Sequence, residues 1–292
     1  MTFAPRKFPR RGWLGLALIA LFWTLNWTLP GLRTMCLFFP LWLGFCLTVD
    51  ALVFFRTATS LIARSLKNYL LLFLYSAPSW WLFELINART RNWEYLGRDQ
   101  VPDLAYAVFA TLSFSTVMPA VFGAAELVAG FPWARRLRIG PRIADRPAFR
   151  RLFFALGWAM LALLLWQPRY FFPFVWLSVY FILEPLNAWL KNPHLLRFTG
   201  RGDWRPVLSL WLGCLLCGFF WEMWNFYAFP KWIYHVPFVD FLRVFEMPLL
   251  GYLGYLPFSL ELYALYHLLN RLFTGNRSDF LILTGADQPS PR

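Results

Sequence analysis

The sequence predicts an all-α, polytopic integral membrane protein, a helical bundle of about eight spans in two tandem four-span repeats. Three observations lead to this fold class. The chain of 292 residues is 59% hydrophobic, 21% aromatic and only 15% charged, whereas a soluble domain is nearer a quarter charged. Several apolar runs reach the roughly 20 residues that a helix needs to cross a bilayer. The third observation is a set of matched spacings between the two halves of the chain.

The first four spans are expected in the N-terminal half. The run at 13–29 follows basic residues, as in a signal peptide. It is long, however, and Pro30-Gly31 stands where a small-residue cleavage site would be, so we interpret it as an uncleaved span. The second run begins near Phe39-Pro40. The expected spans are 13–29, 36–55, 69–88 and 102–129.

The other four spans are expected at 152–166, 171–190, 206–227 and 238–273. The last run has 36 residues and would be roughly 54 Å long as one helix, against a hydrocarbon core of ~30 Å. Proline and glycine residues interrupt it, so we expect a kink or a break in 249–256. Such irregular backbone is tolerated at membrane depth only where protein or a cavity covers it.

The basic residues predict the orientation. Twenty-one of the 28 Lys and Arg residues fall in the N-terminus, in three alternate loops, and in the tail together with the last turn of the final expected span, and six fall in the four opposite loops. Cytoplasmic loops carry the excess of Lys and Arg. We therefore expect a multi-pass protein of the cell inner membrane with both termini cytoplasmic. Topology also explains the net charge of +13, so no nucleic-acid partner is predicted.

The repeat rests on acidic residues at equal spacings in the two halves. An eight-residue spacing separates Trp from acid in Trp42–Asp50 and Trp176–Glu184, and a 24-residue spacing separates Pro from Glu in Pro102–Glu126 and Pro237–Glu261. Two halves of four spans each have the same orientation, and a pseudo-two-fold axis along the membrane normal would relate them. The predicted divisions are a basic N-terminus (1–12), repeat 1 (13–130), a basic linker (131–151), repeat 2 (152–273) and a loosely ordered cytoplasmic tail (274–292).

The first candidate site pairs two glutamates with two asparagines. Glu84 and Asn87 are spaced i, i+3 in an aromatic stretch, and Glu222 and Asn225 repeat that spacing in the second half. Residues three apart share a helix face. A charged group at membrane depth is costly and usually marks a function or a partner. We interpret the glutamates as a pair of acid/base groups that face one another and are oriented by the asparagines.

Substrate binding is assigned to the aromatic and charged residues around this pair. Tryptophan faces stabilise positive charge, and further buried acids mark the membrane interior. The candidates are Trp80, Trp81, Trp221, Trp224, Glu126, Glu261, Arg243 and Glu246. A structural alternative stays open, in which the tryptophans anchor the chain at the interface and the glutamates bond to Arg89, Lys231 or loop amides.

Two other acidic groups have a structural interpretation. Arg56 and Lys191 lie near Asp50 and Glu184 in the sequence, so ion pairing is expected at one membrane face. Asp240, Arg243 and Glu246 are spaced i, i+3, i+6. That spacing places them on one face of a helix, either as an asymmetric functional feature of the second half or as a buried ion-pair ladder.

No metal or cofactor is predicted. The three histidines are scattered, and the sequence has no H-x-x-x-H or E-x-x-H spacing. Cys214 and Cys217 form a C-x-x-C within an apolar run without further thiols, which is typical of small packing residues. No nucleotide-binding loop or nucleophile elbow is present.

Three functions fit this inventory. The first is a membrane-embedded enzyme that uses buried carboxylates for acid/base chemistry on an apolar lipid such as an isoprenoid or carotenoid. The second is a proton-coupled transporter or lipid-handling protein with parallel repeats. The third is a non-catalytic subunit or assembly factor of a membrane complex. The expected partners are membrane lipid, an apolar small-molecule substrate, and a membrane-protein partner or a second copy of the chain.

Overall fold

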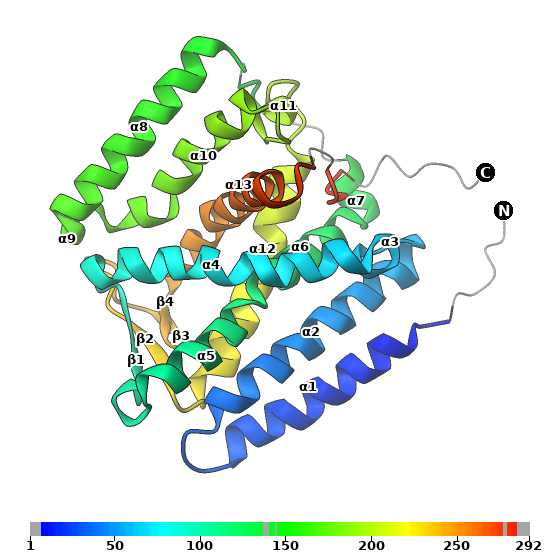
Figure 1. The fold of residues 1–292 in the computed structure, drawn as a ribbon, viewed down its shortest axis with the longest axis vertical. Helices are drawn as coiled ribbons and strands as arrows, with labels where there is room; N and C mark the ends of the chain where they lie inside the picture. Colours follow the sequence, from blue (N-terminus) through cyan, green and yellow to red (C-terminus); the bar gives the residue numbers. More distant parts are fainter. Residues whose placement is uncertain (1–6, 137–139, 144, 277–278, 285–292) are drawn as a thin grey trace.

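The fold is a bundle of long helices with two very small sheets (Figure 1). The computed structural model describes residues 7–136, 140–143, 145–276 and 279–284. The first six residues of the predicted basic N-terminus, four residues of the predicted linker and ten residues of the predicted tail (277–278 and 285–292) lie outside the described residues. The all-α prediction is confirmed.

The described N-terminal half contains three long helices, shorter helices and one strand. These elements are α1 (Arg10–Thr28), α2 (Thr34–Thr57), α3 (Leu61–Arg64), α4 (Leu66–Thr90), β1 (Trp93–Leu96), η1 (Arg98–Gln100), α5 (Asp103–Phe114), α6 (Val117–Ala129) and α7 (Pro132–Arg136).

The C-terminal half differs in its last third, where short strands precede the final helix. Its elements are α8 (Pro147–Trp166), α9 (Pro168–Phe171), η2 (Phe172–Trp176), α10 (Ser178–Trp189), α11 (Leu196–Thr199), α12 (Arg205–Phe226), β2 (Lys231–Tyr234), β3 (Arg243–Val244), β4 (Met247–Pro248), η3 (Leu249–Gly254) and α13 (Tyr255–Thr274).

Six helical segments of the described chain are long and apolar enough to cross a membrane. They are Thr34–Thr57, Leu66–Thr90, Asp103–Ala129, Pro147–Trp166, Pro168–Trp189 and Arg205–Phe226. Helices α1 and α13 were also predicted to span and do form helices of 19 and 20 residues, but they do not meet the same length and composition test. The multi-pass prediction is therefore confirmed for six spans.

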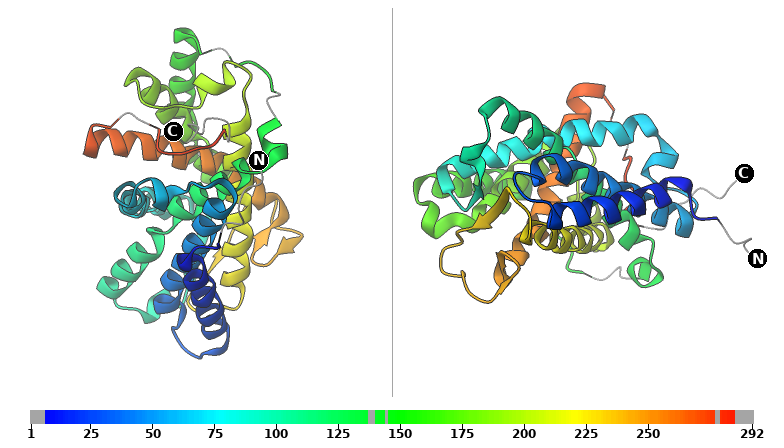
Figure 2. Two further views of the ribbon diagram at one scale, coloured as in Figure 1. Left: turned by 90° about the vertical axis from the view of Figure 1, so that its right-hand side faces the viewer. Right: turned by 90° about the horizontal axis from the view of Figure 1, so that it is seen from below.

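The order of the helices in space follows from their contacts. Helices α6, α12 and α13 form the centre, with α1 and α2 against one side and α8 and α10 against the other. Figure 2 shows the blue N-terminal helices and the green α8 and α10 at opposite ends of the molecule. Helices α1 and α2 approach closely because Gly15 and Gly44 face one another. A Cβ added at Gly44 would lie 2.9 Å from the Gly15 carbonyl oxygen.

The two tips of the bundle carry different structures (Figure 1). The strands β1–β4 and α9 lie at one tip, which we call the strand end. The short helices α3, α7 and α11 lie at the other, which we call the α3 end. Serine caps shape the α3 end. Ser60 Oγ accepts a hydrogen bond from Ala63 N at the start of α3, and Ser65 Oγ accepts one from Asn68 N at the start of α4.

The fourth predicted span is broken in the middle. The helix stops at Phe114 and restarts at Val117, and α4 compensates for the lost backbone bonds. Ser76 Oγ donates to the Phe114 carbonyl at 2.5 Å and accepts from Met118 N at 3.0 Å. Buried irregular backbone is stable where a side chain restores its hydrogen bonds in this way.

The predicted long span at 238–273 is wrong in its first third. The break in 249–256 is confirmed, since η3 ends at Gly254 and α13 begins at Tyr255. The residues before it are not helical and form the β3–β4 hairpin, with Arg243 opposite Pro248. Phe238, Leu242 and Phe245 have positive φ values, a conformation that excludes a continuous helix.

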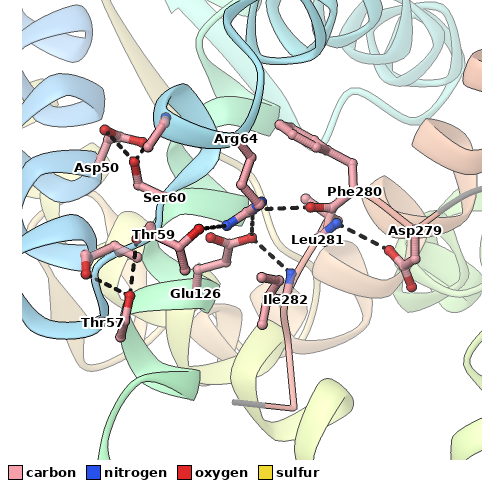
Figure 3. Close-up of polar contacts among 12 residues, drawn as sticks. Asp50, Thr57, Thr59, Ser60, Arg64, Glu126, Asp279, Phe280, Leu281 and Ile282 are labelled. Atoms are coloured by element: carbon pink, nitrogen blue, oxygen red, sulfur yellow. Dashed lines mark hydrogen bonds and ion pairs between the residues drawn. The ribbon is translucent and has the colours of Figure 1, made fainter. Parts of the chain in front are cut away.

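The predicted loose tail is also wrong for residues 279–284, which pack into the α3 end (Figure 3). Phe280, Leu281 and Leu283 are buried. Ile282 N donates to Glu126 Oε1 at 2.9 Å, and Arg64 Nη2 donates to the Phe280 carbonyl at 3.0 Å. We call residues 279–284 the C-terminal segment. It supplies the backbone groups that the carboxylate and guanidinium of this end require.

Candidate functional site

An apolar cavity of about 510 Å³ lies toward the strand end. Its wall is drawn from both halves of the chain. The first half contributes residues of α2, α4, β1, η1, α5 and α6, and the second half contributes residues of η2, α12, β2, β4, η3 and the first turn of α13. Aromatic side chains dominate the lining. They include Trp80, Trp93, Tyr95, Tyr106, Phe114, Trp176, Trp221, Trp232, Tyr234, Tyr255 and Phe258.

Glu84 lies directly behind this wall. One of its oxygens, Oε1, accepts three hydrogen bonds, from Trp80 Nε1 at 2.9 Å, Trp93 Nε1 at 3.0 Å and Tyr95 OH at 2.6 Å. Helix α4 supplies the glutamate and Trp80, and β1 supplies the other two donors. All three donors are neutral side chains that also line the cavity.

Glu222 has a similar environment in the second half. Its Oε1 accepts from Tyr234 OH at 2.7 Å and from Tyr255 OH at 2.6 Å. Trp232 Nε1 donates to the Tyr234 oxygen at 2.8 Å, which extends the chain of hydrogen bonds. Glu222 is completely buried, and its other oxygen, Oε2, has no hydrogen-bond partner among the described residues.

The two asparagines hold the strands rather than the glutamates. Asn87 accepts from the Trp93 backbone N–H and donates to the Trp93 carbonyl. Asn225 makes the same two bonds to Trp232. Both strands carry a donor tyrosine two residues further on, so each asparagine orients its glutamate indirectly, through the strand.

The antiparallel pair β1–β2 joins the two glutamate environments. Trp93 pairs with Tyr234, and Tyr95 pairs with Trp232. The carboxylates were predicted to face one another. Each is instead enclosed by its own donors, and among the described residues no hydrogen bond or ion pair links Glu84 to Glu222.

Among the described residues, the side chains that donate hydrogen bonds to the two glutamates are all neutral. Burial, and then the adjacent Glu84 carboxylate, raises the pKa of the Tyr95 hydroxyl, and burial followed by Glu222 raises the pKa of Tyr234. Both hydroxyls therefore stay protonated as donors at neutral pH. Arg89, one of the alternative partners considered for these glutamates, donates instead to the carbonyls of Leu165 and Trp166.

The predicted tryptophan wall divides into lining and packing residues. Trp80 and Trp221 line the cavity, and Trp221 stacks on Tyr255 with ring centroids 5.9 Å apart. Trp224 is fully buried against Trp42, with centroids 5.0 Å apart, and belongs to the core. Trp81 Nε1 donates to Thr111 Oγ1 at 3.0 Å, away from the cavity lining.

Arg243 and Glu246 lie in and beside the hairpin rather than on a helix face. Arg243 donates to Asp240 at 2.6 Å, and Glu246 forms an ion pair with Lys231. The Asp240–Arg243 pair is partly exposed, with side-chain exposures of 40% and 37%. Arg243 also forms an ion pair with Glu246 at 3.8 Å, so the three residues are linked as predicted. The predicted helix face and its burial are wrong, because the chain turns where a helix was expected.

The remaining predicted acids lie away from the cavity. Asp50 accepts from Arg11 at 2.7 Å and from Ile62 N at 3.0 Å. Arg56, its predicted partner, lies instead over the ring of Phe131.

Glu184 accepts from Leu196 N at 2.6 Å rather than from Lys191. Glu126 pairs with Arg64 (Figure 3). Glu261 is fully buried, and neither of its carboxylate oxygens has a hydrogen-bond partner among the described residues.

Among the residues that the structure describes, no group of three or more His, Cys, Asp or Glu side chains is arranged to hold a metal ion. His194 contacts Asp145 at 3.2 Å and His235 contacts Glu94 at 3.1 Å, each as a separate pair. Cys214 and Cys217 are buried free thiols.

The wall residues that escaped the sequence analysis include Tyr255, Trp176 and Phe258. Tyr255 directly follows the glycine that ends η3, so the predicted break was the one sequence signal for it. Trp176 and Phe258 carry no local signal, because their place in the wall depends on how η2 and α13 pack.

Comparison of the chain with protein-family models, curated proteins and solved structures gives no match.

Proposed function

We propose that this protein is a membrane-embedded enzyme that uses Glu84 and Glu222 for acid/base chemistry on an apolar lipid such as an isoprenoid or carotenoid. The observation that carries the proposal is the aromatic cavity of about 510 Å³ whose tryptophans and tyrosines bond to both glutamates. Pockets of roughly 300–1,000 Å³ suit small-molecule ligands. An apolar ligand fits this lining without leaving polar groups unpaired.

Glu222 is assigned the proton-transfer role, through its tyrosines. When a cationic intermediate loses a proton, the oxygen of Tyr255 or Tyr234 accepts it while the tyrosine's own proton moves to Glu222 Oε1. The reverse transfer protonates a substrate double bond. Because Oε2 has no partner among the described residues, Glu222 can hold a proton there without losing either tyrosine. Rotation of the carboxyl group then presents that proton to a tyrosine oxygen.

Glu84 is assigned the role of stabilising positive charge. Three donors on one oxygen suit a carboxylate, and the indole rings that it holds form part of the wall. Positive charge that develops in the cavity would be attracted both by these rings and by the carboxylate behind them.

We further propose that the bundle is built from two homologous four-span halves, with α1 and α13 completing eight spans and both termini cytoplasmic. Matched hydrogen bonds support the repeat. Asp50 and Glu184 each bond a backbone N–H twelve residues later, and Asn87 and Asn225 bind their strands identically. The proposed halves are 13–130 and 152–273, joined by the linker 131–151.

A proton-coupled transporter is the second candidate, because it would also use buried acids and a broken span. The packing at the α3 end argues against it. There the C-terminal segment, Arg64 and Glu126 fill the bundle, so the cavity does not continue as a polar path through these residues. A non-catalytic subunit of a membrane complex is the third candidate, and it requires a partner that co-purifies with the protein.

The test is a comparison of extracted lipids. Wild type, Glu222→Gln and the exposed control Glu94→Gln are purified in mild detergent, and their lipids are identified by absorption and mass spectrometry. We expect an apolar lipid enriched with wild type and the control, and lost or chemically altered with Glu222→Gln. The same lipid in the same chemical form from all three proteins would contradict the enzyme. Flux through proteoliposomes that depends on a pH gradient would favour transport.

A further inference from the structure

Six hydrogen-bond donors of the cavity wall are turned away from the bound space. Six lining residues give their N–H or O–H groups to partners in or behind the wall. Trp80, Trp93 and Tyr95 donate to Glu84, Tyr234 and Tyr255 donate to Glu222, and Trp232 donates to the Tyr234 oxygen. A ligand that needs to receive hydrogen bonds would find these six donors already engaged.

What these residues can offer the cavity is aromatic ring surface. Trp93 and Trp176 are stacked, with centroids 5.9 Å apart and planes 16° apart. Phe258 lies 5.3 Å from Trp176 and 5.7 Å from Trp80, and Phe114 lies 5.7 Å from Trp80. Ring faces carry negative potential. An indole whose N–H bonds to a carboxylate becomes more electron-rich, which strengthens that potential at Trp80 and Trp93.

The charged groups around the cavity also favour a cation over an anion. Two carboxylates lie behind the wall, and their described hydrogen-bond donors are all neutral side chains. The two basic residues of the lining, Arg98 and Lys231, are each paired with a carboxylate outside the lining, namely Asp103 and Glu246. Their positive charge is therefore locally compensated, and the net field favours a cation.

We infer that this cavity binds an apolar monocation that has no hydrogen-bond donor of its own, such as a quaternary ammonium on a hydrocarbon chain. Resting on the proposed function, the corresponding reactive species is a tertiary carbocation. A proton adds to one alkene carbon, the π electron pair forms the new C–H bond, and the adjacent carbon becomes positive. Loss of a neighbouring proton to the Tyr–Glu222 relay then restores a double bond.

The test uses stable probes that need no turnover. Binding of a decyltrimethylammonium ion is measured on purified protein in nanodiscs by calorimetry. It is compared with the same chain ending in a neutral tert-butyl group and with the primary decylammonium ion. We expect the quaternary ion to bind about tenfold or more tightly than the neutral isostere, as a desolvated cation–π site provides, and more tightly than the primary ammonium, whose donors find few acceptors.

Matched variants locate the binding. Trp93→Leu and Glu84→Gln should reduce the preference for the cation several-fold. Trp158→Leu, at an exposed position on α8 (52% exposed), should leave it unchanged. Elution profile and melting temperature establish that each variant is folded. Equal binding of the cation and its neutral isostere overturns the inference, as does a preference that survives both cavity variants.

The source of the cation is separated by competition. If phosphatidylcholine displaces the probe, the cavity is a cation site whose ligand is a choline headgroup. That result would overturn the proposal that the site stabilises a carbocation. Displacement by an apolar alkene's ammonium analogue but not by phosphatidylcholine supports the proposal that the site stabilises a carbocation. Probe binding without any lipid chemistry would defeat the proposed enzyme and leave the cation site standing.

Discussion

Two acids at each end of the bundle are held in opposite ways. At the strand end, Glu84 and Glu222 are bonded by tryptophan and tyrosine side chains. At the α3 end, Asp50 pairs with Arg11 and Glu126 pairs with Arg64. An arginine stays charged at every relevant pH and fixes its partner as a carboxylate. Neutral donors impose no such charge, so a carboxyl group among them can exchange a proton or respond to a cation.

The difference separates structural acids from candidate chemical groups. The arginine pairs tie α1 to α2, and α3 to α6 and the C-terminal segment, so removing one partner leaves a buried charge uncompensated. The strand-end acids tie aromatic side chains into a cavity wall. Substitutions in the arginine pairs of the α3 end should therefore reduce stability. Substitutions at the acids of the strand end should reduce function.

The largest expected effect is on stability at the α3 end. Glu126→Gln leaves Arg64 without its carboxylate and should lower the free energy of unfolding by about 3 kcal/mol, toward the lower part of the range for buried pairs because Arg64 is partly exposed. Denaturant titration in micelles measures this change. The matched variant Glu222→Gln leaves no arginine unpaired and should cost less than about 1 kcal/mol. Equal losses of stability in the two variants would contradict the proposed difference between the acids of the two ends.

The C-terminal segment should contribute the next largest effect. Leu281 is 5% exposed, and Leu281→Ala should lower the free energy of unfolding by about 2 kcal/mol through the cavity it leaves. The control is Leu272→Ala on α13, where the side chain is 67% exposed and the cost should be within about 0.5 kcal/mol. Thermal unfolding followed by tryptophan fluorescence compares them. A cost at Leu281 no larger than at Leu272 would mean that the segment does not support the fold.

At the strand end, loss of one tyrosine donor should weaken turnover more than stability. Tyr255→Phe leaves Glu222 with Tyr234 as its remaining hydroxyl partner, and the rate of product formation should fall about tenfold. Tyr252→Phe, at a hydroxyl that donates to the Val244 carbonyl, is the control. The rate is measured on the lipid identified by extraction. Unchanged turnover in Tyr255→Phe would remove that residue from the proton path.

The smallest expected effect is a pH dependence outside the spans. The hydrogen bonds from Arg150, with further help from His194, hold the pKa of Asp145 below its ordinary value. A lowered folded-state pKa adds stability above the unfolded value and loses it as pH falls through the folded value. Asp145→Asn should therefore cost up to about 1 kcal/mol at neutral pH. The cost should begin to shrink as the pH falls below about 4 and should disappear only below the lowered folded-state pKa. Unfolding curves at several pH values measure it, and a cost that stays constant down to pH 3 would exclude this pair as its source.

The sequence was informative where one residue type suffices to predict an outcome. Apolar runs predicted the six spans, and Pro248 and Gly254 predicted the break before α13. The glutamate–asparagine spacing identified both centres of the candidate site. The cost of burying each acid made it stand out in the sequence, so each could be found without a structure.

The sequence failed where the outcome depends on chain direction. Residues 238–248 are apolar enough for a helix, yet the chain turns there, because positive φ values at Leu242 and Phe245 shape the β3–β4 hairpin. The partner of Asp50 was missed because Arg11 lies 39 residues away in sequence, whereas the predicted partner, Arg56, is close to Asp50 in sequence. The role of the asparagines became clear only when β1 and β2 were seen to pair.

The position of the C-terminal segment has a consequence for how the protein is made. Phe280 and Arg64 are 216 residues apart, and Ile282 and Glu126 are 156 residues apart. During synthesis, the early helices enter the membrane long before these partners exist. The α3 end is therefore completed last, after α13 has been synthesised, and a tag fused close to residue 284 would interfere with this final docking step.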